Sequence, residues 1–482
     1  ELLGDERLLP AAVRSADHLL SQVGPGQVDI ILTGALYGLP STSILGPIVR
    51  LHRHTGEQRF LDYAEYIVDQ WQHHPDGPPD LVRQGLTDRP LHDWFPEPMK
   101  WAKSYELISC VEGLVDLYRV VGNDDYLTAA QNIHRQLCAW ERSPAGSVSF
   151  DDKFIGSNRL LNTVGELCDI VYWNRLSHEL LCLTGDPSYA DELERSLYNG
   201  LLCGMNREGS WGLRRLRLSH QHVPSHRHCR LNHQQCCVAN SPRGLLQAAE
   251  SAVLTGPEGV AVALYSPGEG TVELPSGRSA TLRIRGDYPA DSRVLIELTP
   301  ESSEALTVRL RIPAWSRETQ VRVNGRVAGR PQPGTWFELK RVWSPGDRVE
   351  LVFDFSLRTE PFDAALPADD PLVVWSEQHW AGVRDMNPDA PPHTLTPADA
   401  RPHRPAVALL RGPVLLCRDA RLTDPFAPVA VDPDALAEAV PSEPPAGVWM
   451  AFEFGATRLW DLASAGNTWD ARSRFSTWFE LP

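Results

Sequence analysis

A glycine that recurs between two helical stretches is the feature that most constrains how this chain can fold. Gly56, Gly122 and Gly185 each follow an apolar segment and precede an amphipathic one, at intervals of about 65 residues. A glycine at the end of a helix supplies the left-handed conformation that stops it, and the Asn or Asp that follows two of these glycines can start the next helix. Each unit is therefore an αα-hairpin, and the repeat predicts an α/α barrel or solenoid. A non-repetitive helical bundle is the alternative.

The hairpin around Gly122 shows the pattern most clearly. Apolar side chains recur three and four positions apart through residues 105–120, and residues 126–137 form a second amphipathic stretch. This spacing predicts one helix before the glycine and one after it. The helical spacing ends near residue 255, where we place a domain boundary.

The second half of the chain has a different periodicity. Residues 308–312 alternate between apolar side chains and arginines, and Asn324-Gly325 follows another alternating run. Alternation predicts strands, and Asn-Gly is the strongest short signal for a hairpin. We therefore expect a multidomain α + β chain. Helical residues 1–254 precede an antiparallel β-sandwich region, of one or two small domains, over residues 255–482.

Composition narrows the function classes. A length of 482 residues predicts two or three domains, and the net charge of −16, from 46 basic against 62 acidic residues, argues against a nucleic-acid partner. No apolar run reaches the roughly 18 residues of a membrane helix. Residues 1–14 carry charges throughout, so we expect no signal peptide. The nine cysteines are spread over a long chain, which favours a reducing compartment and predicts a cytoplasmic protein.

Four ligand-type side chains form the densest candidate metal site. Glu166 and Cys168 lie two positions apart, and Cys236 and Cys237 are adjacent. One carboxylate and three thiolates make a complete tetrahedral ligand set for Zn²⁺. The first pair can share a face only on an extended segment, so we expect an extended conformation there. We expect Ser241 to cap the helix after the cysteine pair, which places the pair near a helix N-terminus that lowers thiol pKa values.

Other interpretations of this region stay open. The spacing is also compatible with buried, unreactive cysteines, since Glu-x-Cys and Cys-Cys each occur often by chance. A histidine-rich run with one further cysteine is a competing metal set, although exposed loop histidines are the simpler interpretation. The members of this run are His220, His222, His226, His228, Cys229 and His233.

Several longer motifs follow one another in a recognisable order. They are Lys103-Ser104-Tyr105-Glu106, Glu112-Gly113-Leu114, Glu166-Leu167-Cys168, Leu183–Arg195, Tyr198-Asn199, Cys236–Gly244, Arg311–Trp315, Val323-Asn324-Gly325 and Ser476-Thr477-Trp478-Phe479. In this order the chain resembles glycoside hydrolase family 127, the β-L-arabinofuranosidase-like proteins. The resemblance covers nearly the whole chain.

This resemblance implies an (α/α)6 catalytic barrel followed by β-sandwich material. It implies a retaining glycoside hydrolase acting on a β-L-arabinofuranoside or a related glycoside, with a carbohydrate as partner. It also implies Zn²⁺ as cofactor, bound by four ligands of which Cys236 is the nucleophile. The ligands carried over by motif are Glu166, Cys168, Cys236 and Cys237. A free thiol is mostly protonated at neutral pH, whereas bound zinc keeps it as the thiolate.

A retaining mechanism also needs a proton donor about 5 Å from the nucleophile. The resemblance places this acid shortly upstream of Glu166, where family members have a glutamate and this chain has Asp151 and Asp152. We favour Asp152, because Phe154 two residues later fits the family's carboxylate-x-Phe pattern. The alternatives are Asp151 as the donor, loss of the acid role, and two solvated turn residues with no catalytic role.

Three other charged residues and the length of the helical half complete the expectations. Glu106 lines the mouth of the barrel or packs within it, and Glu194 and Arg195 hold the barrel together by an internal ion pair. Residues 1–254 are too short for six hairpins at the observed interval. We therefore expect the opening hairpins to be absent or shortened, unless upstream residues complete the barrel.

Two function classes remain, with a third on weaker ground. The first is the zinc-thiolate glycoside hydrolase. The second is a catalytically degenerate relative with a structural zinc that binds a glycan or a protein partner, which the aspartates and the short barrel favour. A sugar epimerase or lyase on the same architecture rests on fold analogy alone. A homodimer is kept open as the assembly, and the sugar and its linkage are not determined by the sequence.

Overall fold

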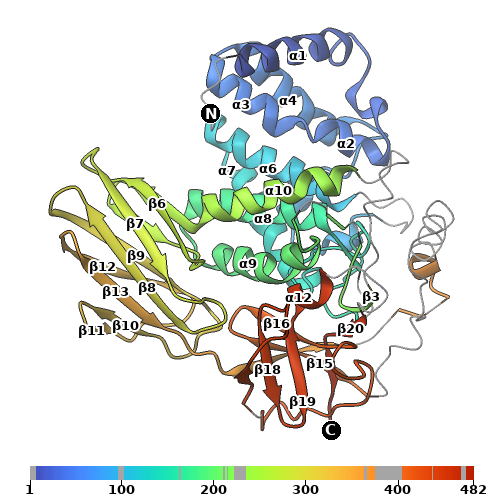
Figure 1. Cartoon of the computed structure of the whole chain (residues 1–482). Coiled ribbons are helices and arrows are strands. Elements are labelled where there is room, and N and C mark those ends of the chain that lie inside the picture. The colour runs from blue at the N-terminus through green and yellow to red at the C-terminus, as the bar shows by residue number, and fades with distance from the viewer. Residues whose placement is uncertain are drawn as a thin grey trace. The chain divides into compact units, whose positions relative to one another are not determined.

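The computed structural model describes two compact units, each of which is considered by itself (Figure 1). The first comprises Glu1–Arg142 and Val148–Asn158, and the second comprises Ser143–Ser147 and Arg159–Pro482. The described residues are 7–95, 103–161, 164–209, 212–213, 215–221, 235–362, 366–367, 369–374, 404–436, 438–467 and 474–482.

The first unit is helical, and α6 forms its centre. Residues 107–117 of α6 are almost entirely buried, because the helix packs against α3 on one side and α7 on another. The described helices are α1 (Leu8–Gln22), η1 (Ile30–Thr33), η2 (Leu36–Gly38), α2 (Leu39–Thr42), α3 (Leu45–Thr55), α4 (Gln58–His73), α5 (Leu81–Gly85), η3 (Leu91–Asp93), α6 (Ser104–Val121) and α7 (Asp124–Trp140).

The recurring glycines adopt the conformation that the sequence predicts. Gly56, Gly122 and Gly185 end α3, α6 and α8 (Leu167–Thr184) with φ values of 71°, 69° and 72°. A second helix follows each of them within a few residues: α4, α7 and α9 (Ser188–Ser196). After the second glycine, the Asn123 side chain accepts a hydrogen bond from the backbone N–H of Asp125 and starts α7. The predicted αα-hairpins are confirmed.

Two long helices of the second unit, α8 and α10 (Gln235–Ala252), pack side by side and run in the same direction (Figure 1). Cys168 contacts Cys237 at one end of the pair, and His178 contacts Ser251 towards the other. The remaining elements of this part are β1 (Val164–Glu166), the π-helical turn η5 (Leu197–Leu201), β2 (Arg215–Arg217) and β3 (Ser219–Gln221).

Most of the other described elements of the second unit are strands. One sheet has the order β11-β10-β13-β8-β7-β6, a second has the order β12-β9-β5-β4, and a third follows the path β14-β15-β16-β19-β18-β17 with β20, β21 and β3 attached. The pairs are antiparallel except β5 with β9. Asn324 and Gly325 form the predicted turn, both with positive φ, between β10 and β11.

The bounds of these elements are β4 (Val253–Gly256), β5 (Gly259–Val262), β6 (Gly268–Glu273), β7 (Ser279–Arg285), β8 (Arg293–Pro300), β9 (Glu304–Ile312), β10 (Gln320–Val323), β11 (Arg326–Gly329), β12 (Thr335–Trp343), β13 (Asp347–Val352), β14 (Leu357–Phe362), β15 (Ala406–Arg411), β16 (Val414–Asp419), β17 (Val440–Ser442), β18 (Ala451–Phe454), β19 (Thr457–Asp461), α12 (Leu462–Gly466), β20 (Arg474–Ser476) and β21 (Trp478–Glu480). The predicted fold class, a helical part followed by antiparallel sheets, is confirmed. Among the described residues, no helix is both long and apolar enough to cross a membrane.

A buried ion pair joins α9 to β9, and it departs from the simple alternation expected for that strand. Arg311 is fully buried, whereas Arg309, two positions earlier on the same face of the strand, is 40% exposed. The guanidinium of Arg311 contacts the carboxylates of Asp191 and Glu194, the latter at 2.7 Å. Tyr288 and Trp315 also donate hydrogen bonds to Glu194. A buried carboxylate needs such a set of donors to offset its lost hydration.

The expected ion pair between Glu194 and Arg195 is wrong. Glu194 pairs with Arg311, and Arg195 pairs with Glu360 of β14 at 2.7 Å. Neighbouring positions on a helix point in different directions, so both side chains find partners on the strands. The motif residue Asn199 has a related role, because it accepts a hydrogen bond from the backbone N–H of Leu415 at 2.7 Å and joins η5 to β16.

Replacing Arg311 by Met should lower the unfolding free energy by about 3–5 kcal/mol, because the buried Glu194 and the partly buried Asp191 then lose their cation. Arg309→Met, which removes a more exposed arginine from the same face of the strand, is the matched control and should cost about 1 kcal/mol or less. Urea unfolding followed by tryptophan fluorescence measures both. Equal losses in the two variants would contradict a special role for the buried pair.

Candidate active site

The Glu166 and Cys168 side chains converge at a junction between a strand and a helix. Glu166 ends β1 with φ −115° and ψ 139° and occupies the N-cap position of α8, and Cys168 lies in the first helical turn. The expected extended conformation is therefore confirmed for Glu166 and wrong for Cys168. The change of conformation between the two positions turns both side chains towards one point.

Cys236 and Cys237 lie in the first turn of α10 as the structure describes it. The expectation that Ser241 caps this helix is wrong, because the helix already runs from Gln235 and contains Pro242. The Ser241 hydroxyl instead donates to the carbonyl of Cys237, four residues back, at 2.8 Å. This bond is available to a serine inside a helix. The cysteine pair still lies at a helix N-terminus, as predicted.

The four side chains meet in one cluster. One ligand atom from each of Glu166, Cys168, Cys236 and Cys237 lies within 4.8 Å of the others. The Sγ atom of Cys237 is 3.4 Å from Sγ of Cys168 and 3.4 Å from Oε1 of Glu166. Tetrahedral zinc with bonds of 2.0–2.3 Å separates its ligand atoms by about 3.3–3.8 Å. The donor set and its spacing therefore fit Zn²⁺.

The surroundings of the cluster oppose ionisation of its thiols. The pKa of Cys168 is raised by a hydrogen bond with Cys236, by burial and by the charge of Glu166. The pKa of Cys237 is raised by hydrogen bonds with the other two thiols and by burial. A divalent cation would reverse this preference, because it stabilises thiolates directly. The positive ends of α8 and α10 act in the same direction.

A hydrogen-bonded pair supports the cluster and was not predicted from the sequence. The Asn240 side chain donates to Sγ of Cys168 at 3.2 Å, and Arg243 donates to Oδ1 of Asn240 at 2.9 Å. A polar partner of this kind orients a metal ligand. The available signal was spacing, because Asn240 lies three and four positions after the cysteine pair and so on the same helix face.

Two glycines allow the backbone to approach the cluster closely. A Cβ at Gly165 would lie 2.5 Å from Cβ of Ser147, so the strand that carries Glu166 has room only for glycine. A Cβ at Gly212 would lie 2.7 Å from the carbonyl oxygen of Cys237 and closer still to the Ser241 hydroxyl.

The two candidate acids form a tight turn in the first unit. Asp151 and Asp152 have φ values of 45° and 67°, and the backbones of Phe150 and Lys153 exchange hydrogen bonds of 2.8 and 2.9 Å. Two consecutive positive φ values define a type I′ turn, for which Asp is a tolerated residue. The side chains are 0% and 1% exposed. The alternative that Asp151 and Asp152 are solvated turn residues is therefore wrong, because both side chains are buried. The two residues do form a turn.

Two lysines and a glutamate surround this turn. Lys103 and Lys153 approach the Asp152 carboxylate at 3.4 and 3.3 Å. Glu106, at the start of α6, is buried, and the pKa of its carboxyl is raised to about 7. Burial is the main cause and the charge of Asp152 adds to it, while Lys103 acts in the opposite direction. A carboxyl with this pKa can both give and take a proton near neutral pH.

Family comparison identifies the group of proteins to which these features belong. The model of the β-L-arabinofuranosidase GH127 catalytic domain matches residues 1–250, and that of the GH127 middle domain matches residues 259–355. The chain belongs to glycoside hydrolase family 127. The resemblance seen in the sequence motifs is thereby confirmed.

Relatives of this GH127 chain agree with the assignment. A non-reducing end β-L-arabinofuranosidase of Bifidobacterium longum subsp. longum is 24% identical over 392 residues, which cover 74% of this chain and 58% of that protein. A GH127 β-L-arabinofuranosidase from Geobacillus stearothermophilus T6 has a similar fold, with a TM-score of 0.69, 20% identity, and 99% of this chain aligned to 77% of that one. A second GH127 β-arabinofuranosidase gives a TM-score of 0.68 at 18% identity, with 99% and 74% coverage.

The histidine-rich run of this GH127 chain stays a prediction. His222, His226, His228, Cys229 and His233 lie outside the described residues. Only the backbone of His220 is described, as part of β3. The competing metal set is therefore not tested.

The raised pKa of Glu106 predicts a pH-dependent contribution to stability. The pKa in the folded chain, about 7, exceeds the ordinary value of 4.5, so the folded state binds the proton more tightly. This contribution is fully present below pH 4.5 and is lost as the pH rises towards 7. Relative to Glu106→Gln, which imitates the protonated form, the wild type should lose stability across this interval and then level off.

Urea midpoints measured between pH 4.5 and 8 for both proteins test this. Glu65→Gln, which changes an exposed carboxyl on α4 of the same unit, is the control and should run parallel to the wild type. A constant difference between the wild type and Glu106→Gln over the whole range would show that the Glu106 pKa is not raised.

Proposed function

We propose that this GH127 chain is a retaining glycoside hydrolase in which Cys236 is the nucleophile and the Glu166, Cys168, Cys236 and Cys237 cluster binds Zn²⁺. One observation carries the proposal. Three of the four side chains are buried to 1% exposure or less, whereas Cys236 is half-buried. A structural zinc site is closed, and a nucleophile must be reachable by its substrate.

The proposed mechanism assigns a role to each residue of the site. Bound zinc would supply charge that keeps the Cys236 thiol ionised at neutral pH. The Cys236 sulfur attacks the anomeric carbon, so that a C–S bond forms as the glycosidic C–O bond breaks and the leaving oxygen takes a proton from the acid. Water then attacks the same carbon, gives its proton to that residue and releases the sugar from sulfur with net retention. Glu166, Cys168 and Cys237 would hold the ion together with Cys236, and Asn240 orients Cys168.

Asp152 is the first candidate for the acid, with Asp151 as the alternative on the same turn. Both carboxyl side chains are buried, in the type I′ turn that Phe150 and Lys153 close. Glu106 is a second candidate, because its raised pKa suits proton donation at neutral pH. Asp151, Asp152 and Glu106 lie close together in the first unit. Replacing each one separately shows which of them donates the proton.

The proposed substrate is a β-L-arabinofuranoside or a related glycoside. Support comes from the Bifidobacterium relative, which is a non-reducing end β-L-arabinofuranosidase. This chain spans 58% of that protein's length, so the same activity is proposed here on similarity.

A cytoplasmic location is proposed as well. Its support is that the cysteines within the described ranges are all free thiols.

The second candidate function is a degenerate relative that binds a glycan or a protein partner and keeps zinc for structure. The observation that favours it is the pair of aspartates at the position where the family resemblance implies a glutamate. This alternative predicts the same metal content and no turnover.

Elemental analysis of untagged protein should find one zinc per chain. Cys168→Ala and Cys237→Ala should lose it, because a tetrahedral site with three ligands binds weakly. Cys203→Ala removes a buried cysteine outside the cluster and should keep the zinc. Cys236→Ser should retain the fold by circular dichroism and lose hydrolysis of β-L-arabinofuranosides. Unchanged hydrolysis in this last variant would exclude the cysteine mechanism, and zinc without turnover in the wild type would favour the degenerate relative.

The acid can be identified by the leaving group. If Asp152 donates the proton, Asp152→Asn should slow cleavage of an alkyl β-L-arabinofuranoside by about 100- to 10,000-fold. A nitrophenyl glycoside, whose leaving oxygen needs no proton, should be affected much less. Asp151→Asn and Glu106→Gln are assayed beside it. The residue whose replacement separates the two substrates is the acid, and a uniform loss on both substrates would exclude that residue from the role.

A further inference from the structure

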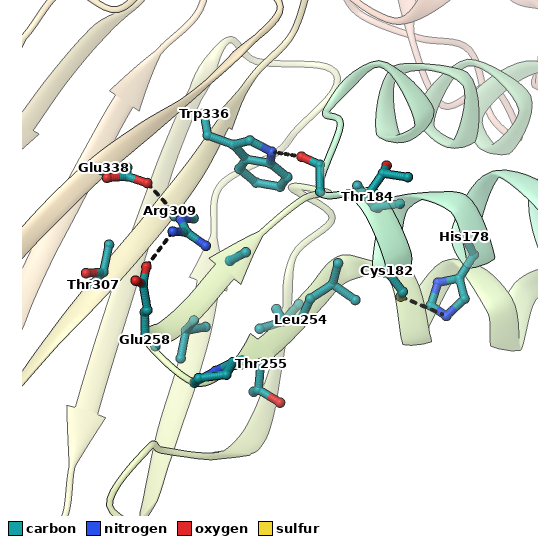
Figure 2. Close-up of a pocket in the computed structure, with 18 of the residues that line it drawn as sticks. His178, Cys182, Thr184, Leu254, Thr255, Glu258, Thr307, Arg309, Trp336 and Glu338 are labelled. Atoms are coloured by element: carbon teal, nitrogen blue, oxygen red, sulfur yellow. Dashed lines mark hydrogen bonds and ion pairs between the residues drawn. The ribbon is translucent and has the colours of Figure 1, made fainter. Parts of the chain in front are cut away.

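A cavity of about 1050 Å³ lies in the second unit, between the ends of two helices and a sheet (Figure 2). Its walls come from α8, the last turns of α10, the β4–β5 hairpin and strands β9 and β12. Positions 168 and 182 of α8 are separated by about 21 Å along the helix axis. The cavity therefore lies at the opposite end of the α8–α10 pair from the Glu166 cluster, and the proposed glycosidase chemistry does not use it.

A cysteine and a histidine of α8 meet on the cavity wall. Cys182 is exposed and follows His178 by one turn, and its Sγ atom lies 3.5 Å from Nε2 of the imidazole (Figure 2). Nδ1 of the same ring is 2.9 Å from the hydroxyl of Ser251 on α10. Two helices therefore contribute to one line of polar groups.

The direction of the hydrogen bonds along this line is fixed by its last member. The Ser251 hydroxyl donates its proton to the carbonyl of Gln247 at 2.6 Å, so towards the ring it can only accept. Nδ1 of His178 therefore carries a hydrogen and donates it to Ser251. In the neutral ring this leaves Nε2 as an acceptor, and the Cys182 thiol donates to it. Cys182 is thus placed as a nucleophile, His178 as its base and Ser251 as the group that orients the base, which is the arrangement of an activated nucleophile.

A second cysteine–histidine pair four residues apart, on α7, lacks an accessible base. Cys138 follows His134 by one turn of α7, with Sγ 3.8 Å from Nδ1. Burial lowers the pKa of His134 to about 3, so this imidazole does not take a proton near neutral pH. The sequence pattern His-x-x-x-Cys is the same in both places, and only the pair beside the cavity has an accessible thiol with an oriented base.

Charge selects what can approach Cys182. The cavity is lined by Glu250, Glu258, Glu338 and Arg309, and Arg309 is already paired with two of these carboxylates at 2.6 and 2.9 Å. Acidic groups are therefore in excess, and an anionic molecule is repelled. Apolar residues such as Leu181 and Leu254 supply the rest of the wall.

We propose that Cys182 is a modification site that forms mixed disulfides with small disulfides that carry no net negative charge. In the exchange, His178 takes the thiol proton and the Cys182 sulfur attacks one sulfur of the reagent. A new S–S bond forms as the old one breaks, and the departing thiolate takes the proton from His178. Cys182 is oxidised to the mixed disulfide, and half of the reagent is reduced to a thiol, so no other oxidant is needed.

Reaction with cystamine, a cationic disulfide, tests the base. The zinc-loaded chain is mixed with cystamine at pH 7, and the labelled peptides are followed by mass spectrometry. Cys182 should be labelled before Cys138, and Cys182→Ser should remove the fast phase. His178→Gln should slow labelling of Cys182 about 10-fold, because the thiolate fraction falls when the base is removed. Labelling of Cys182 at the wild-type rate in this variant, or faster labelling of Cys138 in the wild type, would overturn the proposal.

A second pair of measurements protects the test against a folding defect and examines charge. Ser251→Ala leaves His178 in place and removes its orienting partner, so it should slow labelling by a smaller factor. Circular dichroism checks the fold of each variant. The rates of an anionic aryl disulfide and of cystamine are each divided by the rate of the same reagent with free cysteine. After this correction, the anionic reagent should label Cys182 several-fold more slowly than cystamine. Glu250→Gln or added salt should reduce the difference between the two corrected rates. Equal relative rates for the two reagents would overturn the charge selection.

Discussion

The parallel packing of α8 against α10 is the constraint on which both special regions of the second unit depend. Contacts between Cys168 and Cys237 fix the two helices at their first turns, and the contact between His178 and Ser251 fixes them further along. Parallel alignment brings two positive helix ends to the same place, which is unfavourable by itself and favourable once thiolates or a carboxylate lie there. The ligand cluster therefore matches the electrostatics of the helix pair that holds it.

Two of the buried carboxylates in the second unit, Glu194 and Glu166, are stabilised differently. Glu194 is surrounded by an arginine, a tyrosine and a tryptophan that belong to the chain itself. Glu166 lies beside Cys168 and Cys237, whose pKa values are raised, in an arrangement that suits a cation from outside. The first arrangement holds α9 against the sheet, and the second is the candidate active site. A buried anion needs a compensating partner in either case, and the source of that partner separates a structural role from a proposed chemical one.

Particular residues show how far the sequence could lead. The three glycines predicted the hairpin turns correctly, because a left-handed backbone is a local property of glycine. The four candidate ligands were selected from residue types, and the structure brings their side chains together. The Glu194–Arg195 pair and the Ser241 cap were wrong, since each depends on which distant residue or earlier turn is available. The hydrogen bond from Asn240 to Cys168 and the close approach of Gly165 to Ser147 were not predicted, for the same reason.

The sequence by itself determined where helices stop, where the Asn-Gly hairpin forms, which residue types could bind a metal, and to which family the motifs point. These follow from backbone preferences and side-chain chemistry that act over a few residues. The tertiary structure alone decided that Arg311 is buried against α9, that Asp151 and Asp152 are enclosed, and that one His-x-x-x-Cys pair faces a cavity while another has a buried base. Those outcomes depend on burial and on partners far apart in the chain, and packing fixes both.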